Sequence, residues 1–137
     1  MIATLETKLV DYIQDDVRVL VDSKNLGEEF HSECEFKFVG RIDDKLVGII
    51  AYRLGELQGI PCPQFCHVIV EAEFRGDEEV RILLKDSENL LKSMGYFKTY
   101  CYILSYKKYM HKSALRHGYE EFQSDGEGTF YIKNLGG

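Results

Sequence analysis

The stretch that decides the fold is CHVIVEAEFRGDEEVRILLKDSENLLKSMGY, residues 66–96. Its first part contains an apolar run, 68–70, that is typical of a buried β-strand. A turn at Arg75-Gly76 follows, and residues 78–93 then carry apolar side chains at helical spacing. Gly95 is typical of the residue just past a helix C-terminus. The stretch therefore predicts a buried strand, a tight turn and an amphipathic helix at the centre of a small α/β domain.

The flanking sequence adds further strands and helices. We expect a first helix from Thr4 to about Val17, with residues up to Val21 extending it or forming a second one. Residues 43–45 are typical of a hairpin turn, and the breakers in residues 55–63 favour a loop. The remaining elements are strands at 34–38, 46–52, 64–71, 97–103, 119–123 and 129–133 and a helix at 106–117. A strand-helix-strand unit between hairpins predicts a mixed sheet.

The composition is that of one globular domain. The chain has 137 residues, 45% of them hydrophobic and 29% charged, and its nine Tyr and eight Phe need a core. The net charge of -6 argues against nucleic acid as a partner and is compatible with a cationic or amine-bearing substrate. No run reaches the ~18 apolar residues of a membrane span, and the N-terminus lacks signal-peptide features. We expect a cytoplasmic protein, with no membrane partner, whose cysteines are reduced thiols.

A helix that starts directly after a buried strand favours anion binding. Its free N–H groups and its dipole point into the space beyond the carboxyl end of the strand. Open α/β sheets commonly bind ligands at such places. The start of the 78–93 helix is therefore a candidate ligand site.

Two segments of the chain resemble the GNAT (Gcn5-related) N-acetyltransferases. EFRGDEEVRILLK (73–85), followed by LLKSMGY (90–96), is similar to that family's acetyl-CoA-binding motif, in which an Arg-Gly turn leads into a long helix ending at Gly-aromatic. RHGY (116–119) resembles the end of the family's last helix. The resemblance implies one GNAT-like domain, 1–137, with a mixed α/β architecture of about six to seven strands and three to four flanking helices. It also implies acetyl-CoA as co-substrate and an amine acceptor, either a small molecule or a peptide.

The turn departs from the family pattern in two positions. Glu78 and Val80 stand where the family has glycines that let the backbone approach a pyrophosphate. The carboxylates of residues 77–79 cap a helix well but repel phosphate. Two interpretations therefore stay open, a plain helix start and a pyrophosphate site whose carboxylates point outward.

The resemblance also implies which residues bind the cofactor. The strand at 66–71 would bind the pantetheine arm through its main chain, as an added strand. Arg75, Arg81 and backbone N–H groups would bind the pyrophosphate, and Ser105 lies near the position of an Asn that the family often uses. The expected cofactor residues are Val68, Ile69, Val70, Arg75, Gly76, Asp77, Glu78, Val80, Arg81 and Ser105.

Amine acetylation needs a base for the amine and an acid for the leaving thiolate. By period-two logic, His67 and Glu71 share one face of their strand, and either is a candidate base. Where many GNAT proteins have the acidic Tyr, four residues before the final helix Gly, this chain has Ala114. Tyr109 on the same helix is the candidate replacement. Each of the three has a plain structural alternative, as a packed or solvated side chain.

No metal site is expected. Cys62, Cys66 and His67 lack zinc-site spacing, and His111 and His117 are six residues apart on their helix rather than four.

Three functions remain in view, the third being an unrelated small α/β regulatory module. The first is an acyl-CoA-dependent N-acyltransferase with direct transfer to an amine. The second is a catalytically degenerate GNAT-like binding or structural protein, such as a phage accessory protein, because small divergent domains of this kind occur among phage-encoded proteins. The Tyr- and Phe-rich final strands also suggest pairing into a homodimer.

Overall fold

A mixed β-sheet forms the centre of the fold in the computed structural model, which describes residues 5–10, 14–24, 34–74 and 78–136. The elements, in chain order, are β1 (Glu6–Val10), α1 (Asp15–Asp22), β2 (Phe36–Ile42), β3 (Lys45–Leu57), β4 (Ile60–Val70), the 3-10 turn η1 (Ala72–Phe74), α3 (Glu78–Ser93), β5 (Lys98–Leu104), α4 (Lys108–Arg116), β6 (Glu120–Ser124) and β7 (Gly128–Asn134). The seven strands lie in the order β1-β2-β3-β4-β5-β7-β6. Every neighbouring pair is antiparallel except β4 and β5, which are parallel. The predicted mixed sheet is confirmed.

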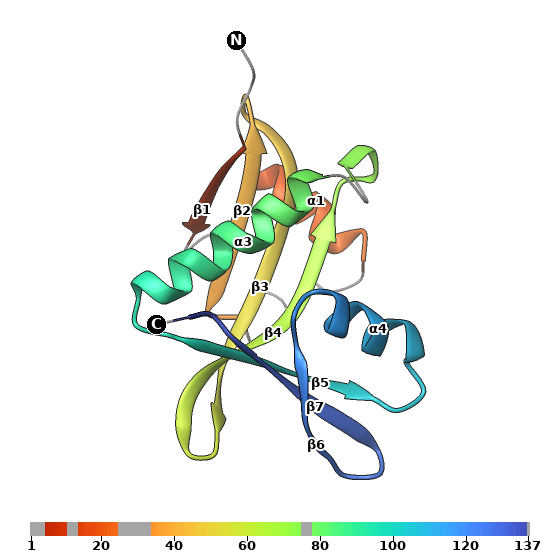
Figure 1. Ribbon diagram of the computed structural model, residues 1–137. Coiled ribbons are helices and arrows are strands. Elements are labelled where there is room, and N and C mark those ends of the chain that lie inside the picture. Colours follow the sequence, from red (N-terminus) through yellow and green to blue (C-terminus); the bar gives the residue numbers. More distant parts are fainter. Residues whose placement is uncertain (1–4, 11–13, 25–33, 75–77, 137) are drawn as a thin grey trace.

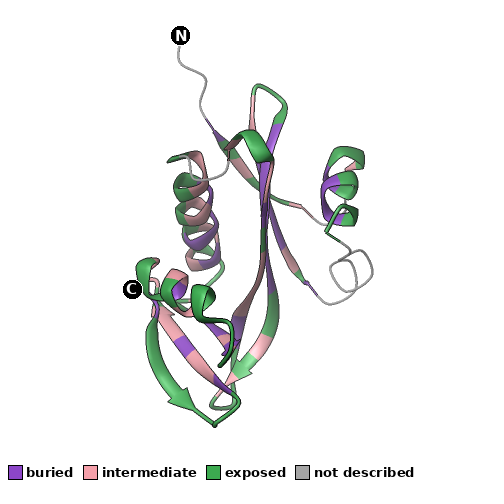
Figure 2. Cartoon of the chain, turned by 90° about the vertical axis from the view of Figure 1, so that its right-hand side faces the viewer, coloured by how far each residue is buried: buried purple, intermediate pink, exposed green. Residues whose placement is uncertain are grey.

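Helices cover both faces of the sheet. α1 lies on one face, and α3 and α4 lie on the other (Figures 1 and 2). The core on the α1 face consists of Val17, Leu20, Val21, Cys34, Val39, Leu46, Ile49, Ala51 and Ile69. The core on the α3 face consists of Leu5, Phe38, Val47, Ile50, Tyr52, Leu83 and Leu91. The buried residues of α3 lie on the side of the helix that faces the sheet (Figure 2). None of the described helices is long and apolar enough to cross a membrane.

The predicted helix at 78–93 is confirmed with the same bounds as α3. Its apolar stripe buries Leu83 and Leu91 completely. Glu78 and Glu79 occupy the first turn and Lys92 the last, which matches the helix dipole at both ends. Gly95 follows with φ +96°, a left-handed conformation that glycine adopts without strain.

The first predicted helix is wrong over residues 6–10, which form the edge strand β1. Leu5 and Leu9 have helical spacing with the later apolar residues, but β1 pairs along its whole length with β2, from Glu6–Arg41 to Val10–Lys37. Long-range pairing of this kind overrides local periodicity. The helix itself begins only at Asp15, and Tyr12 and Ile13 lie outside the described residues.

The predicted loop at 55–63 is also wrong, because β3 and β4 form a long hairpin that turns at Gln58-Gly59. Both turn residues have positive φ, 53° and 80°. The backbone N–H of Leu54 bonds to the Glu35 carboxylate rather than to β4, so the Leu54–Pro63 pair is not hydrogen-bonded. Hydrogen-bonded and non-hydrogen-bonded pairs alternate along an antiparallel ladder, so the Glu56–Pro61 pair is not hydrogen-bonded either. Neither proline therefore removes a donor that the β3–β4 ladder uses.

The two parallel strands β4 and β5 diverge. Their ladder contains one residue pair, Gln64 with Tyr100, among the described residues. Beyond that pair the two strands separate into a V, visible in Figure 1. β4 also contains a bulge, because the β3 partners move from Ala51–His67 to Tyr52–Phe65 and leave Cys66 as the extra residue. This splay is the feature that positions the candidate site.

Tyr100 fixes the closed end of the V. Its hydroxyl reaches over β4 to Gly55 of β3, where an added Cβ would lie 2.1 Å from the hydroxyl oxygen. The same hydroxyl donates to the Gln64 side-chain carbonyl at 3.4 Å. Only a residue without a side chain fits at position 55 with Tyr100 in this place.

Candidate functional site

The open side of β4 presents backbone groups toward the splay. The N–H of Glu71 donates to the Val47 carbonyl at 2.9 Å, so residues 71, 69 and 67 make the hydrogen-bonded pairs with β3. Val68 lies between them, and its N–H and C=O point away from β3, toward the side of β5. The single pair of the β4–β5 ladder lies four residues earlier, at Gln64. The strand therefore offers main-chain hydrogen bonds to an extended ligand, which is the chemistry of strand addition.

An apolar cavity of about 310 Å³ lies in the splay. α3 and α4 cover it, and β4 and β5 form its floor. Its lining consists of Ile50, Phe65, Cys66, Val68, Val80, Leu84, Cys101, Tyr102, Ile103, Tyr109, Met110, Ser113, Ala114, His117 and Tyr119. Burial raises the pKa of the Cys101 thiol to about 12 and also raises the pKa of the Tyr119 hydroxyl. The thiol and the hydroxyl are therefore neutral at pH 7. The lining contains no Asp or Glu, so the cavity suits an uncharged ligand.

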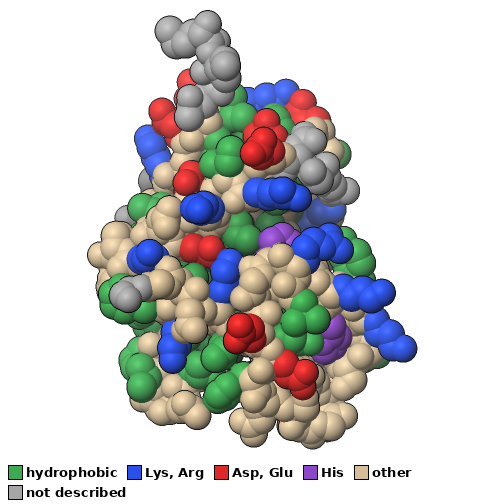
Figure 3. All heavy atoms as spheres, in the orientation of Figure 1, with side chains coloured by type: hydrophobic (Ala, Val, Ile, Leu, Met, Phe, Trp, Pro, Cys, Tyr) green, Lys and Arg blue, Asp and Glu red, His purple; other side chains and the backbone are tan. Residues whose placement is uncertain are grey.

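A second and larger hollow, of about 630 Å³, runs along the outer side of α3 toward the end of β7. We call it the cationic groove. It is lined by Arg81, Leu84, Lys85, Glu88, Asn89, Lys92, Arg116, His117, Gly118, Lys133, Asn134 and Leu135. Five of these side chains are cationic and one is a carboxylate, in a chain with a net charge of -6. Lys and Arg side chains gather across the middle of this face, over α3 and α4 (Figure 3).

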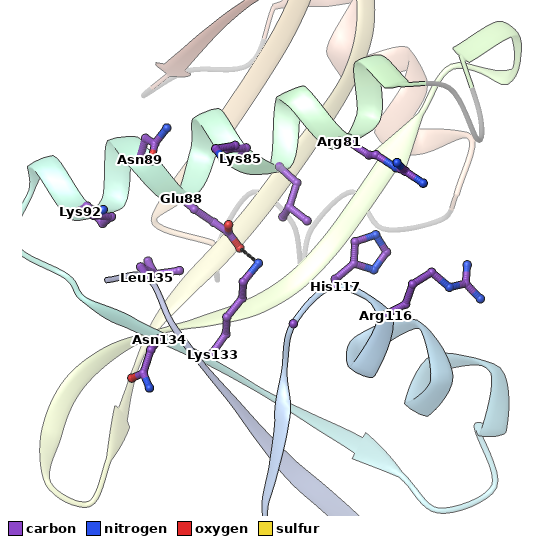
Figure 4. A pocket seen from close by; sticks show the side chains of 12 residues that line it. Arg81, Lys85, Glu88, Asn89, Lys92, Arg116, His117, Lys133, Asn134 and Leu135 are labelled. Atoms are coloured by element: carbon purple, nitrogen blue, oxygen red, sulfur yellow. Dashed lines mark hydrogen bonds and ion pairs between the residues drawn. The ribbon is translucent and has the colours of Figure 1, made fainter. Parts of the chain in front are cut away.

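The positive charge of the groove has a defined arrangement. Arg81 of α3 lies at the same end of the groove as His117 and Arg116 of α4 (Figure 4). Further along, the ammonium of Lys133 is bonded to the Glu88 carboxylate at 2.7 Å. That pair is mostly buried, with side-chain exposures of 19% and 12%. Lys133 is thus neutralised by Glu88, whereas the groove residues Arg81, Lys85, Lys92 and Arg116 form no ion pair among the described residues.

The cavity and the groove share a wall. Leu84 and His117 line both, one from α3 and one from the end of α4. The His117 ring is held by its contact with the Ser113 carbonyl at 2.8 Å. Val80 and Arg81 are consecutive residues, yet the first lines the cavity and the second the groove. A ligand with an apolar arm and an anionic end would meet both environments in one stretch.

The structure brings together some of the predicted cofactor residues. Val68 and Val80 line the cavity, and Arg81 lines the groove. Ile69 is buried in the core of the α1 face, and Val70 is half-buried.

The other predicted cofactor residues lie apart from both hollows or outside the described part. Glu78 is exposed and lines neither hollow. Ser105 also lines neither, and its N–H donates to the Glu127 carbonyl at 2.8 Å. Arg75, Gly76 and Asp77 lie outside the described residues.

The three predicted catalytic residues lie on different sides of the splay. Tyr109 lies in the first turn of α4 and lines the cavity while its side chain remains accessible. His67 pairs with Ala51, a core residue of the α1 face, so its side chain points to that face and away from α3. Glu71 follows β4 directly and is half-buried. The cavity wall also contains Ala114, at the position where the family resemblance places a Tyr.

Sequence reasoning missed several lining residues. Lys85 lies four residues after Arg81 on α3, so a cationic stripe at helical spacing was readable. Lys133 and Arg116 had no such signal, since only the fold brings them to α3. Tyr102 lines the cavity and donates its hydroxyl to the Asp125 carboxylate at 3.0 Å. Partial desolvation and that carboxylate raise the pKa of Tyr102, so its hydroxyl stays neutral in the cavity wall.

The described residues contain no cluster of three His, Cys, Asp or Glu side chains arranged as metal ligands.

Comparison with solved structures identifies the architecture. A protein of Desulfovibrio desulfuricans, described as an acetyltransferase of the GNAT family, superposes with a TM-score of 0.74 at 14% identity, over 97% of this chain and 100% of that one. The chain has the GNAT fold. The Thermoplasma acidophilum PaiA N-acetyltransferase in complex with coenzyme A gives a TM-score of 0.67 at 13% identity, and a Bacillus subtilis acetyltransferase in complex with CoA gives 0.65 at 14%. Both comparisons cover 96% of this chain and 99% of the other. No known family profile and no curated protein sequence matches the chain.

The splay lies where the resemblance places the pantetheine arm, along the strand predicted at 66–71, because β4 and β5 share one described residue pair and then diverge. Fold similarity at this level of identity does not specify the substrate, so the chemistry has to be argued from the lining residues.

Proposed function

We propose that this protein is an acyl-CoA-dependent N-acyltransferase that transfers an acetyl group from acetyl-CoA directly to an amine. One observation carries the proposal: the splay of β4 and β5 opens an apolar cavity whose wall continues into a cationic groove. Acetyl-CoA has an uncharged pantetheine arm, which matches the apolar cavity, and an anionic nucleotide end, which matches the cationic groove. That two structural neighbours contain coenzyme A supports the same ligand class.

The residues divide the binding between them. The backbone of Val68 would bond the pantetheine amides, and the apolar lining would exclude water from the thioester. Arg81 and Arg116 would attract the phosphates, to which guanidinium groups bind well. The Arg75-Gly76 turn, Asp77 and Ser105 keep the cofactor-binding roles predicted for them. A negative phosphate near the N-terminus of α3 is further stabilised by the helix dipole.

The proposed acetyl transfer uses residues on both faces of the sheet, with the candidate bases on the α1 face and Tyr109 on the cavity side. The amine would approach from the α1 face, where His67, or Glu71 through water, would take its proton. The amine nitrogen attacks the thioester carbonyl carbon, the carbon–sulfur bond breaks, and the thiolate takes a proton from Tyr109. The products are the acetylated amine and free CoA. In this scheme Tyr109 serves as the acid, because Ala114 stands where many GNAT proteins have the acidic Tyr.

Calorimetry and an acetylation assay test the proposal. Acetyl-CoA should raise the unfolding midpoint, because a ligand that binds the native state must stabilise it. Mass spectrometry should detect acetylation in a panel of polyamines and lysine peptides. Tyr109→Phe should lower kcat about 100-fold, whereas Tyr106→Phe, an exposed residue outside the cavity, should leave kcat unchanged. No stabilisation at millimolar acetyl-CoA would rule out the proposal.

A second function has one specific observation in its favour. The cavity wall has Ala114 instead of a Tyr, and α3 begins with Glu78 at a position where the family has a glycine. A GNAT-like protein that binds acyl-CoA without transferring it, such as a phage accessory protein, fits those substitutions. Stabilisation by acetyl-CoA with no acetylated product across the panel would favour this function.

A further inference from the structure

Two cysteine thiols meet beside the cavity. Cys34 comes two residues before β2, and Cys66 is the extra residue in the bulge of β4. Their side chains contact each other, although the strand β3 separates β2 from β4 in the sheet, and the Cys66 thiol donates to the Gln64 carbonyl at 3.4 Å. Both pack in the core of the α1 face, Cys34 as a buried member and Cys66 as a partly buried neighbour.

The bulge gives Cys66 a second environment. Cys66 also lines the apolar cavity and is half-buried, whereas Cys34 is 3% exposed. An oxidant that enters the cavity therefore reaches Cys66 first. The other two cysteines lack such a partner in the described contacts: the Cys62 thiol donates to the Lys98 carbonyl at 3.3 Å, and Cys101 lies in the separate cluster beneath α4.

We propose that Cys34 and Cys66 form a redox modification site, at which a hydroperoxide joins them in a reversible disulfide that controls the cavity. Cys66 attacks the peroxide oxygen and becomes a sulfenic acid, and one water leaves. The Cys34 sulfur then attacks the sulfenic sulfur, and its proton leaves with the hydroxyl as a second water. The sum is two thiols and one hydrogen peroxide giving one disulfide and two waters.

The chemistry around Cys34 suits the second step. Its contact with Cys66 and its burial raise the pKa of the Cys34 thiol, so Cys34 stays protonated and inert until Cys66 has reacted. The nearby ammonium of Lys37 acts in the opposite direction and favours negative charge on the sulfur as the proton leaves, while the Glu35 carboxylate opposes it to a smaller extent. The pair thus resembles a reactive thiol with its resolving thiol, the arrangement that protects against irreversible oxidation.

The effect on the cavity follows from bond length and rests on the proposed function. Sulfur atoms in a disulfide lie about 2.05 Å apart, closer than in a thiol hydrogen bond, so Cys66 must move toward Cys34. Cys66 is the bulge residue that sets the direction of β4 between Phe65 and His67. Its displacement shifts the backbone of Val68 relative to β5, and acetyl-CoA binding weakens.

Peptide mapping tests the site without any ligand. The reduced protein is treated with hydrogen peroxide, alkylated, digested without reductant and analysed by mass spectrometry. We expect a Cys34–Cys66 linked peptide that disappears with dithiothreitol and persists in the Cys62→Ser/Cys101→Ser variant. In Cys34→Ser, Cys66 should instead oxidise further to sulfinic acid. Separately alkylated Cys34 and Cys66 peptides in the peroxide-treated wild-type protein would overturn the proposal.

A second measurement separates this proposal from the proposed function. The acetyl-CoA-induced rise of the unfolding midpoint is compared in the oxidised and the reduced protein. A smaller rise in the oxidised protein, restored by dithiothreitol, supports control of the cavity, and equal rises overturn it. If acetyl-CoA stabilises neither form while the linked peptide is present, the modification site stands and the proposed function fails.

Discussion

The apolar cavity and the cationic groove differ in how they are built, although α3 and α4 border both. The cavity depends on the absence of pairing between β4 and β5, and its lining comes from segments that the sheet topology brings together. The groove depends on side-chain charge along one helix, together with Arg116 and Lys133 from later elements. The cavity is therefore sensitive to volume, and the groove to charge and ionic strength. Substitutions that affect only one of them test whether both bind one ligand.

Filling the cavity should have the largest effect. Ala114→Trp places an indole in a space of about 310 Å³, and a cost of about 1–3 kcal/mol for fitting the ligand beside it corresponds to weakening of acetyl-CoA binding by about 5- to 150-fold. Isothermal titration calorimetry measures the affinity. The matched control is Leu115→Trp, which adds the same ring at an adjacent exposed position outside the lining. Equal loss in both variants would mean that the cavity is not the binding site.

Removing the one carboxylate of the groove should act in opposite directions on stability and binding. Glu88→Gln leaves the mostly buried ammonium of Lys133 without its partner, so the free energy of unfolding should fall by about 1–3 kcal/mol. The same change adds net positive charge to the groove, and acetyl-CoA should bind more tightly. Urea denaturation and calorimetry report the two effects. Glu73→Gln is the stability control, because its pair with Lys45 is more than half exposed and should contribute under about 1 kcal/mol. A lower affinity in Glu88→Gln would contradict the role of the groove.

The arginines of the groove should discriminate between parts of the ligand. Arg81→Ala and Arg116→Ala should each weaken acetyl-CoA binding about fivefold, or about 1 kcal/mol, and reduce its dependence on salt. Neither should change the affinity for S-acetyl-pantetheine, which lacks the phosphates. Arg18→Ala, an exposed arginine of α1 on the opposite face, serves as the control. If acetyl-CoA and S-acetyl-pantetheine lose affinity equally, the two hollows do not share the ligand in the proposed way.

The smallest effect is expected at a charge pair remote from both hollows. Arg41 bonds to Asp16 at 2.6 Å and holds the pKa of that carboxyl below its ordinary value. A lowered folded-state pKa stabilises the protein above the ordinary carboxyl pKa and loses this effect as the pH falls through the folded value. Asp16→Asn should therefore cost under about 1 kcal/mol at neutral pH and nothing near pH 2, as measured by urea denaturation. A cost that grows toward acid would reverse the sign and refute this account.

Much of the fold was readable from the sequence because local and long-range signals agreed there. α3 has a strong apolar stripe, acidic residues at its start and a glycine at its end, and its bounds were predicted correctly. Where the signals disagreed, long-range pairing decided. The helical spacing of Leu5 and Leu9 did not prevent β1 from pairing with β2, and Pro61 and Pro63 occupy strand positions whose N–H groups the ladder does not need.

The site was less predictable because its walls come from segments far apart in the chain. Val68, Val80 and Arg81 were predicted from one motif and do line the two hollows. Arg116 and Lys133 are isolated charges in the sequence and become part of a site only after α4 and β7 are placed. The contact between Cys34 and Cys66 was equally hidden, because it involves a bulge in β4 and joins residues on either side of β3.

Under the proposed function, the contact of Tyr100 with Gly55 would allow a residue far from the ligand to set which acyl chain lengths fit. β4 and β5 are paired only near Gln64 and Tyr100 among the described residues and diverge from there. At this paired end the Tyr100 hydroxyl lies against Gly55 of β3. A small rotation of β4 relative to β5 at the paired end would displace the two strands by a larger distance at the open end, where the acyl group would lie. Gly55→Ala would displace Tyr100 and change the opening without touching the ligand. Within a family of related chains, substrate range would then vary with the residue at the paired end, while the residues facing the substrate stay the same.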